Sequence, residues 1–245
     1  MPKPETRNQG RIIAFLQNAA LSFLRQFVDF IYPPYCILCE SYLQPFENIV
    51  CQKCWSRQQK LEIPFLACDQ LKRKPGEKWW LDGSLALFKY SSATQQLVHY
   101  LKYKRFTKLA KPFGRDMAKV LAGEPWLETI DAMIPVPLHP KRLRERGFNQ
   151  SYLLAKAAVD QLKIKVWDDA LIRTRYTQPQ AKMQREERLR NVTNAFKFNS
   201  AASVENKNVV LVDDVFTTGS TMNECARILR MAGAKKVTSL TIVRV

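Results

Sequence analysis

The chain has 245 residues, 46% of them hydrophobic and 25% charged; enough apolar side chains are present for a core, which excludes a largely disordered protein. Lysine and arginine number 39 against 22 acidic residues, a formal net charge of +17 that favours nucleic acid, an anionic membrane or a highly phosphorylated ligand as partner. A basic, solvated surface explains the charge equally well.

The first predicted element is an N-terminal amphipathic helix, because apolar residues recur at intervals of three and four over residues 12–31. We interpret residues 1–32 as this helix, with its apolar stripe used for packing; docking to a membrane surface or a partner is the alternative. The segment lacks the cleavage site of a secretory signal. Arg25 and Asp29 exclude a transmembrane span, so no transmembrane segment is expected here.

Two C-x-x-C pairs follow the helix, and their four cysteines are Cys36, Cys39, Cys51 and Cys54. Four thiolates complete a tetrahedral shell with no open position, which predicts a structural zinc ion; reduced, metal-free knuckles are the alternative. Clustered cysteines favour metal binding in a reducing compartment, so we expect a cytoplasmic protein. Residues 33–80 are therefore predicted to be a zinc-ribbon-like module and a linker. Cys68 stands alone, and a second zinc site is not expected.

Residues 81–245 alternate between strand and helix patterns, which predicts an α/β fold with a mostly parallel sheet and helices on both faces. The predicted elements are strands at 85–90, 132–137, 209–212 and 237–243, and helices at 94–103, 149–162 and 220–232. Between the second and third strands, residues 174–191 are polar and lack a clean period. A loop of this length indicates a functional role.

Residues 209–221 carry the strongest functional signal. A continuous apolar run predicts a buried strand that delivers Asp213 and Asp214 to the edge of the sheet where ligands bind in open α/β folds. A hydroxyl-rich turn leading into a helix follows, made of Thr217, Thr218, Gly219, Ser220 and Thr221. Helix N–H groups and hydroxyls bind phosphate, and paired carboxylates accept hydrogen bonds from vicinal hydroxyls. Together they predict a site for a phosphorylated ribose, most simply phosphoribosyl pyrophosphate.

A Walker B element or a structural helix cap would each give a similar motif. A Walker B strand also ends in acidic residues, but none of the eight glycines is followed by lysine, so the partner Walker A loop is missing. A hydroxyl-rich helix N-cap can have a purely structural role. Paired aspartates have no structural need at that position, which favours a binding site.

The motif resembles the phosphoribosyl pyrophosphate motif of type I phosphoribosyltransferases, and the wider chain resembles the ComF family. The likeness extends to the cysteine module, to the segments 101–103, 146–150 and 180–188, and to Asn191 and residues 195–196. It implies a type I phosphoribosyltransferase-like fold, with a role in DNA uptake during natural transformation or in handling single-stranded DNA.

The resemblance also implies a set of site residues. Asp213 and Asp214 would bind the ribose hydroxyls, and the turn 217–221 would bind the 5-phosphate. Arg144 and Arg146 would bind the pyrophosphate, since the guanidinium fork matches phosphate oxygens, and Mg²⁺ would bridge pyrophosphate and sugar oxygens. The loop 174–191 would be a closing hood that carries Gln180, Arg185 and Arg188.

Two functions follow as hypotheses. The first is a phosphoribosyltransferase that transfers the phosphoribosyl group to an acceptor, which the sequence does not identify, and releases pyrophosphate. The second is a non-catalytic nucleic-acid-binding accessory protein, working with DNA-uptake or helicase proteins, that uses the site for regulation or for DNA phosphates. A basic cluster could contact nucleic acid or simply be a solvated helix face: Lys102, Lys104, Arg105, Lys108 and Lys111. We interpret Trp79 and Trp80 as packing residues, with base stacking as the alternative.

Overall fold

The computed structural model describes residues 34–71, 78–176, 192–199 and 202–245. The predicted N-terminal helix and most of the predicted hood, with Gln180, Arg185 and Arg188, lie outside these residues. The chain forms two compact units that divide between Arg57 and Gln58.

The first unit contains the small cysteine module. Its helix α2 spans Gln52–Ser56, and an antiparallel bridge joins Tyr35 to Tyr42. The buried cluster of the module consists of Leu43 and three of the cysteines, with Leu38 and Val50 packed against it. So small an apolar core needs a cross-link or a metal ion to stabilise it.

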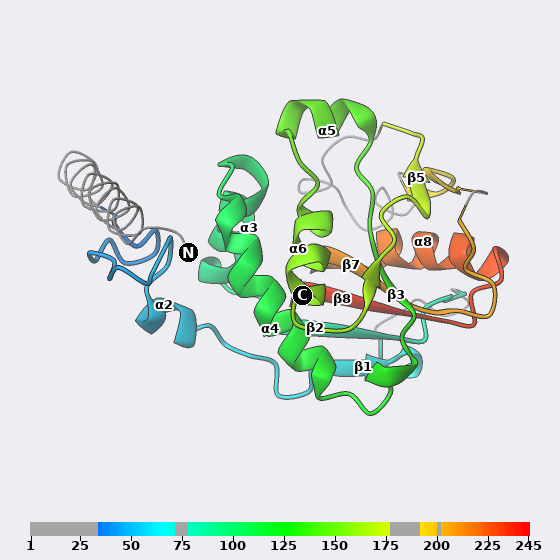
Figure 1. Cartoon of the computed structure of the whole chain (residues 1–245), viewed down its shortest axis with the longest axis horizontal. Helices are drawn as coiled ribbons and strands as arrows, with labels where there is room; N and C mark the ends of the chain where they lie inside the picture. Colours follow the sequence, from blue (N-terminus) through cyan, green and yellow to red (C-terminus); the bar gives the residue numbers. More distant parts are fainter. Residues whose placement is uncertain (1–33, 72–77, 177–191, 200–201) are drawn as a thin grey trace, which may run out of the picture. The chain divides into compact units, whose positions relative to one another are not determined.

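The second unit is built on a six-stranded sheet in the order β1-β2-β8-β7-β3-β4 (Figure 1). The strands are β1 Phe65–Ala67, β2 Gly83–Lys89, β3 Ala132–Pro135, β4 Lys165–Val166, β7 Asn208–Phe216 and β8 Lys236–Arg244. Every neighbouring pair is parallel except β1 with β2. β5 Leu171–Arg173 and β6 Phe196–Phe198 form a separate antiparallel pair.

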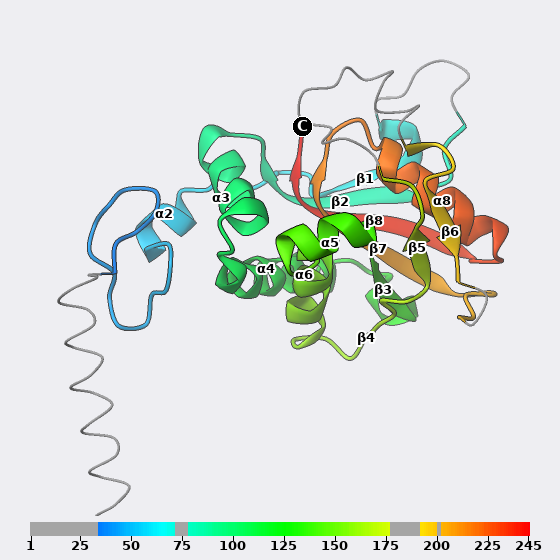
Figure 2. The ribbon, with the colours of Figure 1, turned by 90° about the horizontal axis from the view of Figure 1, so that it is seen from above.

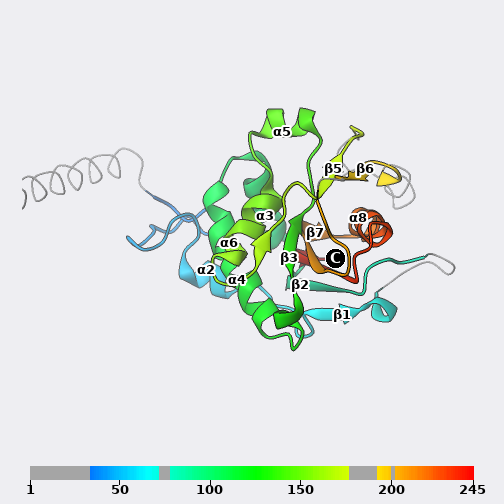
Figure 3. The same cartoon turned by 45° about the vertical axis from the view of Figure 1, so that its right-hand side comes forward.

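Helices cover both faces of this sheet. They are α3 Ser92–Tyr103, α4 Ala110–Ala122, α5 Pro140–Arg146, α6 Gln150–Val159 and α8 Ser220–Met231, with short 3-10 helices η1 Cys68–Gln70, η2 Thr107–Leu109 and η3 Leu127–Thr129. Figures 2 and 3 show α4 and α6 on one face and α8 on the other. The central strands β7 and β8 are buried along most of their length, as expected for parallel strands that helices cover on both faces.

The predicted α/β class with a mostly parallel, helix-flanked sheet is confirmed. The boundary between the parts differs from the predicted one at residue 81. Phe65–Ala67 pairs with β2 and Lys60 bridges to Phe88, so residues 58–80 belong to the second unit. Helices α4 and α5 and strands β1, β4, β5 and β6 were not predicted, the strands because runs of two or three residues carry no detectable period.

No helix in the described parts of the chain combines the length and the apolar character needed to cross a membrane.

Candidate functional site

A cavity of about 350 Å³ opens where the chain leaves the carboxyl ends of β3 and β7. Its walls come from α3, from the segment after β3, from α5, and from the loop between β7 and α8. Asp213, Asp214 and every residue of 217–221 line it, as does Arg146. The residues predicted from the β7–α8 motif therefore face one common cavity, at the edge of the sheet where open α/β folds bind ligands.

The two adjacent aspartates are held in different ways. The Asp213 Oδ1 atom accepts a hydrogen bond of 2.8 Å from the Ser151 hydroxyl and another of 2.9 Å from the backbone N–H of Asp214. The Asp214 Oδ1 atom lies 2.8 Å from the Lys102 ammonium. The second oxygen of Asp214, Oδ2, is buried and has no hydrogen-bond partner in the described part of the chain. An unsatisfied buried oxygen in a cavity is an acceptor available to a ligand.

Lys102 is a site residue that the sequence did not identify. It comes from the last turn of α3, which the fold brings to the end of β7, and it lines the cavity. Burial acts to lower the pKa of Lys102, but the carboxylates of Asp214 and Asp213 outweigh burial and raise it. Lys102 therefore carries its positive charge at neutral pH and offsets one of the two carboxylates.

Burial and the neighbouring Asp214 carboxylate raise the pKa of Asp213 to about 6, against the lowering effects of Lys102 and Ser151. An exposed aspartate titrates at 3.8, so as the pH rises the unfolded chain releases this proton before the folded one does. The group therefore lowers the free energy of unfolding between about pH 4 and pH 6. Above pH 6 the free energy of unfolding stays lowered.

We expect Asp213→Asn to become more stable relative to the wild type as the pH rises from 4.5 to 7.5, by roughly 2 kcal/mol. Urea unfolding at the two pH values measures the change. Asp131→Asn is the control, because the backbone N–H of Asn208, together with Lys207, lowers the pKa of Asp131. Asp131 therefore titrates below this window, and the stability gap between Asp131→Asn and the wild type should stay nearly constant across it. A gap between Asp213→Asn and the wild type that stays constant with pH would contradict the raised pKa.

The turn after β7 has the geometry of an anion site. Gly219 is the N-cap of α8 in the left-handed conformation, with φ of +72° and no side-chain cap, and the first turn of the helix lines the cavity. The N–H groups of a first helical turn have no partner within the helix; here that of Ser220 lies 3.4 Å from the Thr218 hydroxyl. The hydroxyls of Thr218 and Ser220 lie 2.8 Å apart, and Thr217 is exposed. Free helix N–H groups and several hydroxyls at one point supply the donors that a phosphate group needs.

Aromatic rings support this turn from behind. A Cβ atom added to Gly219 would lie 2.3 Å from the Trp79 ring and 2.6 Å from the Phe216 ring. Asn223 fixes the segment that carries Trp79, accepting a hydrogen bond from the N–H of Trp80 at 2.7 Å and donating one to the carbonyl of Lys78 at 3.0 Å. Trp79 thus packs against the turn, in agreement with the packing interpretation.

Gly219→Ala is expected to destabilise the protein by about 2–4 kcal/mol, through the left-handed backbone and the overlap with two rings. Gly147→Ala is a matched control: Gly147 has φ of +84°, but a Cβ there would meet nothing within 4 Å. The control should cost only about 1–2 kcal/mol, from the backbone alone. Chemical denaturation of both variants measures the difference. Equal losses would show that the Trp79 contact contributes nothing.

The cations opposite the turn differ in part from those predicted. Arg146 lines the cavity, and its guanidinium donates to the Gln150 side chain and lies 5.2 Å from the centre of the Tyr103 ring. Arg144 is exposed and does not line the cavity, whereas Arg142 does. The segment is a helix, so residues 142 and 146 share one face while 144 points elsewhere. Arg142 therefore replaces Arg144 in the candidate site.

Arg173 is a further cation of the cavity that sequence reasoning missed. It ends strand β5, is 7% exposed, and lies with its guanidinium 5.1 Å from the centre of the Phe196 ring. Burial and the charge of the nearby Arg142 lower the pKa of Arg173. The three guanidinium groups that line this cavity, those of Arg142, Arg146 and Arg173, favour an anionic ligand.

The predicted basic cluster does not form one surface. Lys102 pairs with Asp214 inside the cavity, and Arg105 lines a separate, smaller pocket next to it. Lys104, Lys108 and Lys111 are exposed. Lys102 therefore belongs to the cavity and is not part of an outward-facing basic patch.

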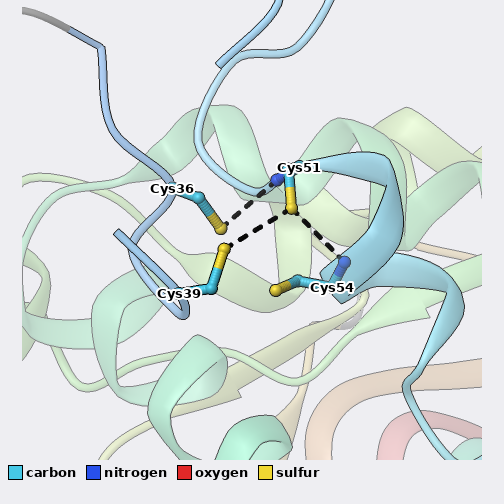
Figure 4. A group of neighbouring side chains, drawn as sticks. All are labelled: Cys36, Cys39, Cys51 and Cys54. Atoms are coloured by element: carbon cyan, nitrogen blue, oxygen red, sulfur yellow. Dashed lines mark hydrogen bonds between the residues drawn. The ribbon is translucent and has the colours of Figure 1, made fainter. Parts of the chain in front are cut away.

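The four cysteines of the first unit converge, as Figure 4 shows. Their sulfur atoms all lie within 4.8 Å of one another, and the Sγ atoms of Cys39 and Cys51 are 3.7 Å apart. A tetrahedral zinc ion with Zn–S bonds of about 2.3 Å places its sulfurs roughly 3.8 Å apart. Backbone N–H groups of Cys51 and Cys54 point at cysteine sulfurs at 3.4 Å. The cluster thus fits the predicted zinc site.

Part of the cavity lies in a segment that is similar to a known domain. Residues 149–245 match the family model described as the phosphoribosyl transferase domain. This span includes β7, α8 and β8, and with them both aspartates and the hydroxyl-rich turn 217–221. The chain is thus similar to that domain over the part that forms the acidic and hydroxyl-rich side of the cavity.

Two relatives are similar over most of their length. The DNA utilization protein YhgH of Escherichia coli O6:H1 is 32% identical over 198 residues, covering 78% of this chain and 82% of the relative. The competence protein ComFC of Bacillus subtilis is 27% identical over 210 residues, covering 85% and 83%. Among solved structures, glutamine phosphoribosylpyrophosphate amidotransferase from B. subtilis is 24% identical, with a TM-score of 0.37 over 54% of this chain and 26% of that chain.

Proposed function

The chain belongs to the ComF family, and we propose that its cavity binds phosphoribosyl pyrophosphate and that the protein is a phosphoribosyltransferase-like protein acting in DNA utilization. The relatives carry the names DNA utilization protein and competence protein, and the matched domain is a phosphoribosyl transferase domain. The reduced cysteine cluster makes a cytoplasmic location part of this proposal.

One observation supports the ligand most strongly: the carboxylates of Asp213 and Asp214 lie in the same cavity as the hydroxyl-rich helix N-terminus 217–221. Carboxylates accept hydrogen bonds from the two ribose hydroxyls, while the helix N–H groups and hydroxyls donate to the 5-phosphate. A single phosphorylated ribose satisfies both halves. Neither inorganic phosphate nor a sugar without phosphate does so.

The arginines are assigned to the pyrophosphate. Arg142 and Arg146 come from α5 and Arg173 from β5, and all three line the cavity. Guanidinium groups bind phosphate oxygens with two parallel hydrogen bonds, which Lys102 alone would not provide. Arg185 and Arg188, which the family resemblance places in the hood, are proposed to join them when the site closes.

Mg²⁺ is proposed to accompany the ligand, held by pyrophosphate and sugar oxygens with water completing its shell. The donor set fits this role, because Asp214 Oδ2 is a buried carboxylate oxygen with no hydrogen-bond partner among the described residues. It is available to a ribose hydroxyl or to a metal-bound water. When bound, the ion would neutralise pyrophosphate charge.

For catalysis, we propose a displacement at the anomeric carbon. The bond from that carbon to the pyrophosphate oxygen breaks as a nucleophile of the acceptor bonds to the carbon, through a sugar with oxocarbenium character. The arginines stabilise the charge that develops on the leaving pyrophosphate. Asp213 and Asp214 hold the ribose by its hydroxyls, so the anomeric carbon stays in place during the displacement.

The second candidate function is a non-catalytic nucleic-acid-binding accessory protein that cooperates with DNA-uptake or helicase proteins. The net charge of +17, the exposed lysines 104, 108 and 111, and the names of the relatives favour it. In this case the sugar-phosphate site serves regulation or holds DNA phosphates.

Calorimetric titration distinguishes the candidates. Phosphoribosyl pyrophosphate with Mg²⁺ should bind at one site per chain and more tightly than ribose 5-phosphate or pyrophosphate alone, because only the whole ligand fills both halves of the cavity. Release of pyrophosphate with a series of acceptors then tests turnover. Equal affinity for the whole ligand and for pyrophosphate would contradict the ribose assignment. Binding of single-stranded DNA that weakens steeply with salt, without any binding of phosphoribosyl pyrophosphate, would favour the accessory protein.

A further inference from the structure

A second pocket, of about 190 Å³, lies beside the ligand cavity. Lys102, Tyr103, Arg142 and Arg146 line both, so the two spaces share a wall. The proposed phosphoribosyl pyrophosphate site does not use the rest of the second pocket. Its remaining lining residues come from the end of α3, from α5 and from the residues after β5.

Two tyrosines give this pocket an aromatic lining. Tyr103 is 54% exposed and Tyr176 is 40% exposed, large values for rings that line a pocket. Cations flank both rings: the Arg146 guanidinium lies 5.2 Å from the Tyr103 centroid and the Lys141 Nζ atom lies 4.7 Å from the Tyr176 centroid. Solvent-facing aromatic rings among cations are the platforms on which nucleic acid bases stack.

The charges of the pocket favour an anion. Four of its lining residues are basic and one, Glu145, is acidic. Lys102 is paired with Asp214, and Arg146 donates to Gln150. Arg105 makes no ion pair within the described residues, and its backbone is held in the left-handed conformation with φ of +57°. At least one guanidinium is therefore directed to this pocket without a counter-charge.

This pocket is chemically different from the cavity beside it. It has no pair of carboxylates to receive ribose hydroxyls and no helix N-terminus to receive a 5-phosphate among its described lining residues. It offers flat apolar rings and guanidinium groups instead. A second copy of the sugar phosphate would leave the rings unused, whereas a ligand with both an aromatic ring and a phosphate would use both kinds of group.

We propose that this second pocket is a nucleotide subsite, in which a base stacks on Tyr103 or Tyr176 and a phosphate is bound by Arg105. The proposal deepens the proposed function and rests on it for one point: the nucleotide occupies its pocket together with phosphoribosyl pyrophosphate and next to it. The nucleotide is either a free molecule or the terminal unit of a single strand, and both present a base and a phosphate to the pocket.

The test uses the full-length, zinc-loaded protein saturated with phosphoribosyl pyrophosphate and Mg²⁺. Calorimetry follows the binding of deoxyadenosine monophosphate, and fluorescence anisotropy follows a labelled six-nucleotide single strand with or without a 5′-phosphate. Tyr176→Ala and Arg105→Ala should each weaken binding about tenfold, and Tyr176→Phe should restore it because stacking needs only the ring. Lys163→Ala, an exposed cation outside the pocket, should change affinity less than about twofold.

The possible outcomes distinguish a free nucleotide from a strand end, and failure of the subsite from failure of the proposed function. Binding of the mononucleotide supports a free ligand, and binding of the phosphorylated strand alone supports a strand end. Either result sustains the subsite if the variants weaken it. Strict competition between nucleotide and phosphoribosyl pyrophosphate, or equal affinity in Tyr176→Ala and wild type, overturns it. If phosphoribosyl pyrophosphate does not bind but the nucleotide does, with the same sensitivity to the variants, the subsite stands and only the proposed function fails.

Discussion

Replacing Asp213 and Asp214 together by asparagine should weaken the binding of phosphoribosyl pyrophosphate at least about 100-fold. Each carboxylate is assigned a hydrogen bond from a ribose hydroxyl, and a hydrogen bond to a charged group is worth about 1.5–3 kcal/mol. The amides keep the shape of the side chains but lose the charge. Calorimetric titration in the presence of Mg²⁺ measures the loss.

This double variant also removes the counter-charge of Lys102, whose ammonium lies 2.8 Å from Asp214. A buried charge left without its partner destabilises a protein. The double variant is therefore also made together with Lys102→Met, which removes the unpaired charge and keeps the fold intact. Asp131→Asn is the matched control, because Asp131 is a part-buried aspartate that pairs with Lys207 at 3.0 Å and does not line the cavity. Unchanged affinity in the correctly folded variants would refute the assignment of the ribose.

Cys51→Ser should remove the bound zinc and unfold the cysteine module. The buried cluster of the module holds only Leu43 besides three cysteines, so apolar packing alone would not sustain it. Structural zinc sites contribute about 10–16 kcal/mol of apparent binding free energy, which here serves as folding free energy. Metal analysis should give one zinc per wild-type chain and none in the variant, and limited proteolysis should cleave the module.

Cys68→Ser is the matched control, since Cys68 is a free, half-buried cysteine outside the cluster. It should keep the full zinc content. Binding of phosphoribosyl pyrophosphate should survive in both variants, because every residue that lines the cavity belongs to the second unit. A zinc content that Cys51→Ser leaves unchanged would show that the four thiolates do not hold the ion.

The site residues that were predicted from the sequence are those that lie close together along the chain. The run from Val209 to Thr221 is one strand, one turn and the start of one helix, so its side chains meet through local geometry. The strand runs to Phe216, beyond the predicted end at residue 212, and still delivers both aspartates to the cavity. The four cysteines were likewise identified by spacing alone.

The parts that sequence reasoning missed depend on tertiary packing or on an unrecognised helix. Lys102 reaches Asp214 from a helix more than a hundred residues away in sequence, and no pattern within α3 indicates this contact. Arg142 could have been found. Pro140 at the first turn and Gly147 just past the end are the usual boundaries of a helix, and the spacing of 142 and 146 then puts both arginines on one face.

The contact between Trp79 and Gly219 has a practical consequence for measurement. Trp79 is one of five tryptophans, and its indole lies against the backbone of the turn assigned to the 5-phosphate, 6.1 Å from the Phe216 ring between centroids. No tryptophan lines the cavity itself among the described residues, so a ligand would affect Trp79 only through the contact of its ring with the turn. Occupation of the turn by a dianion should therefore shift the emission of this fluorophore. The protein carries its own optical probe of ligand binding, and Trp79→Phe identifies the signal.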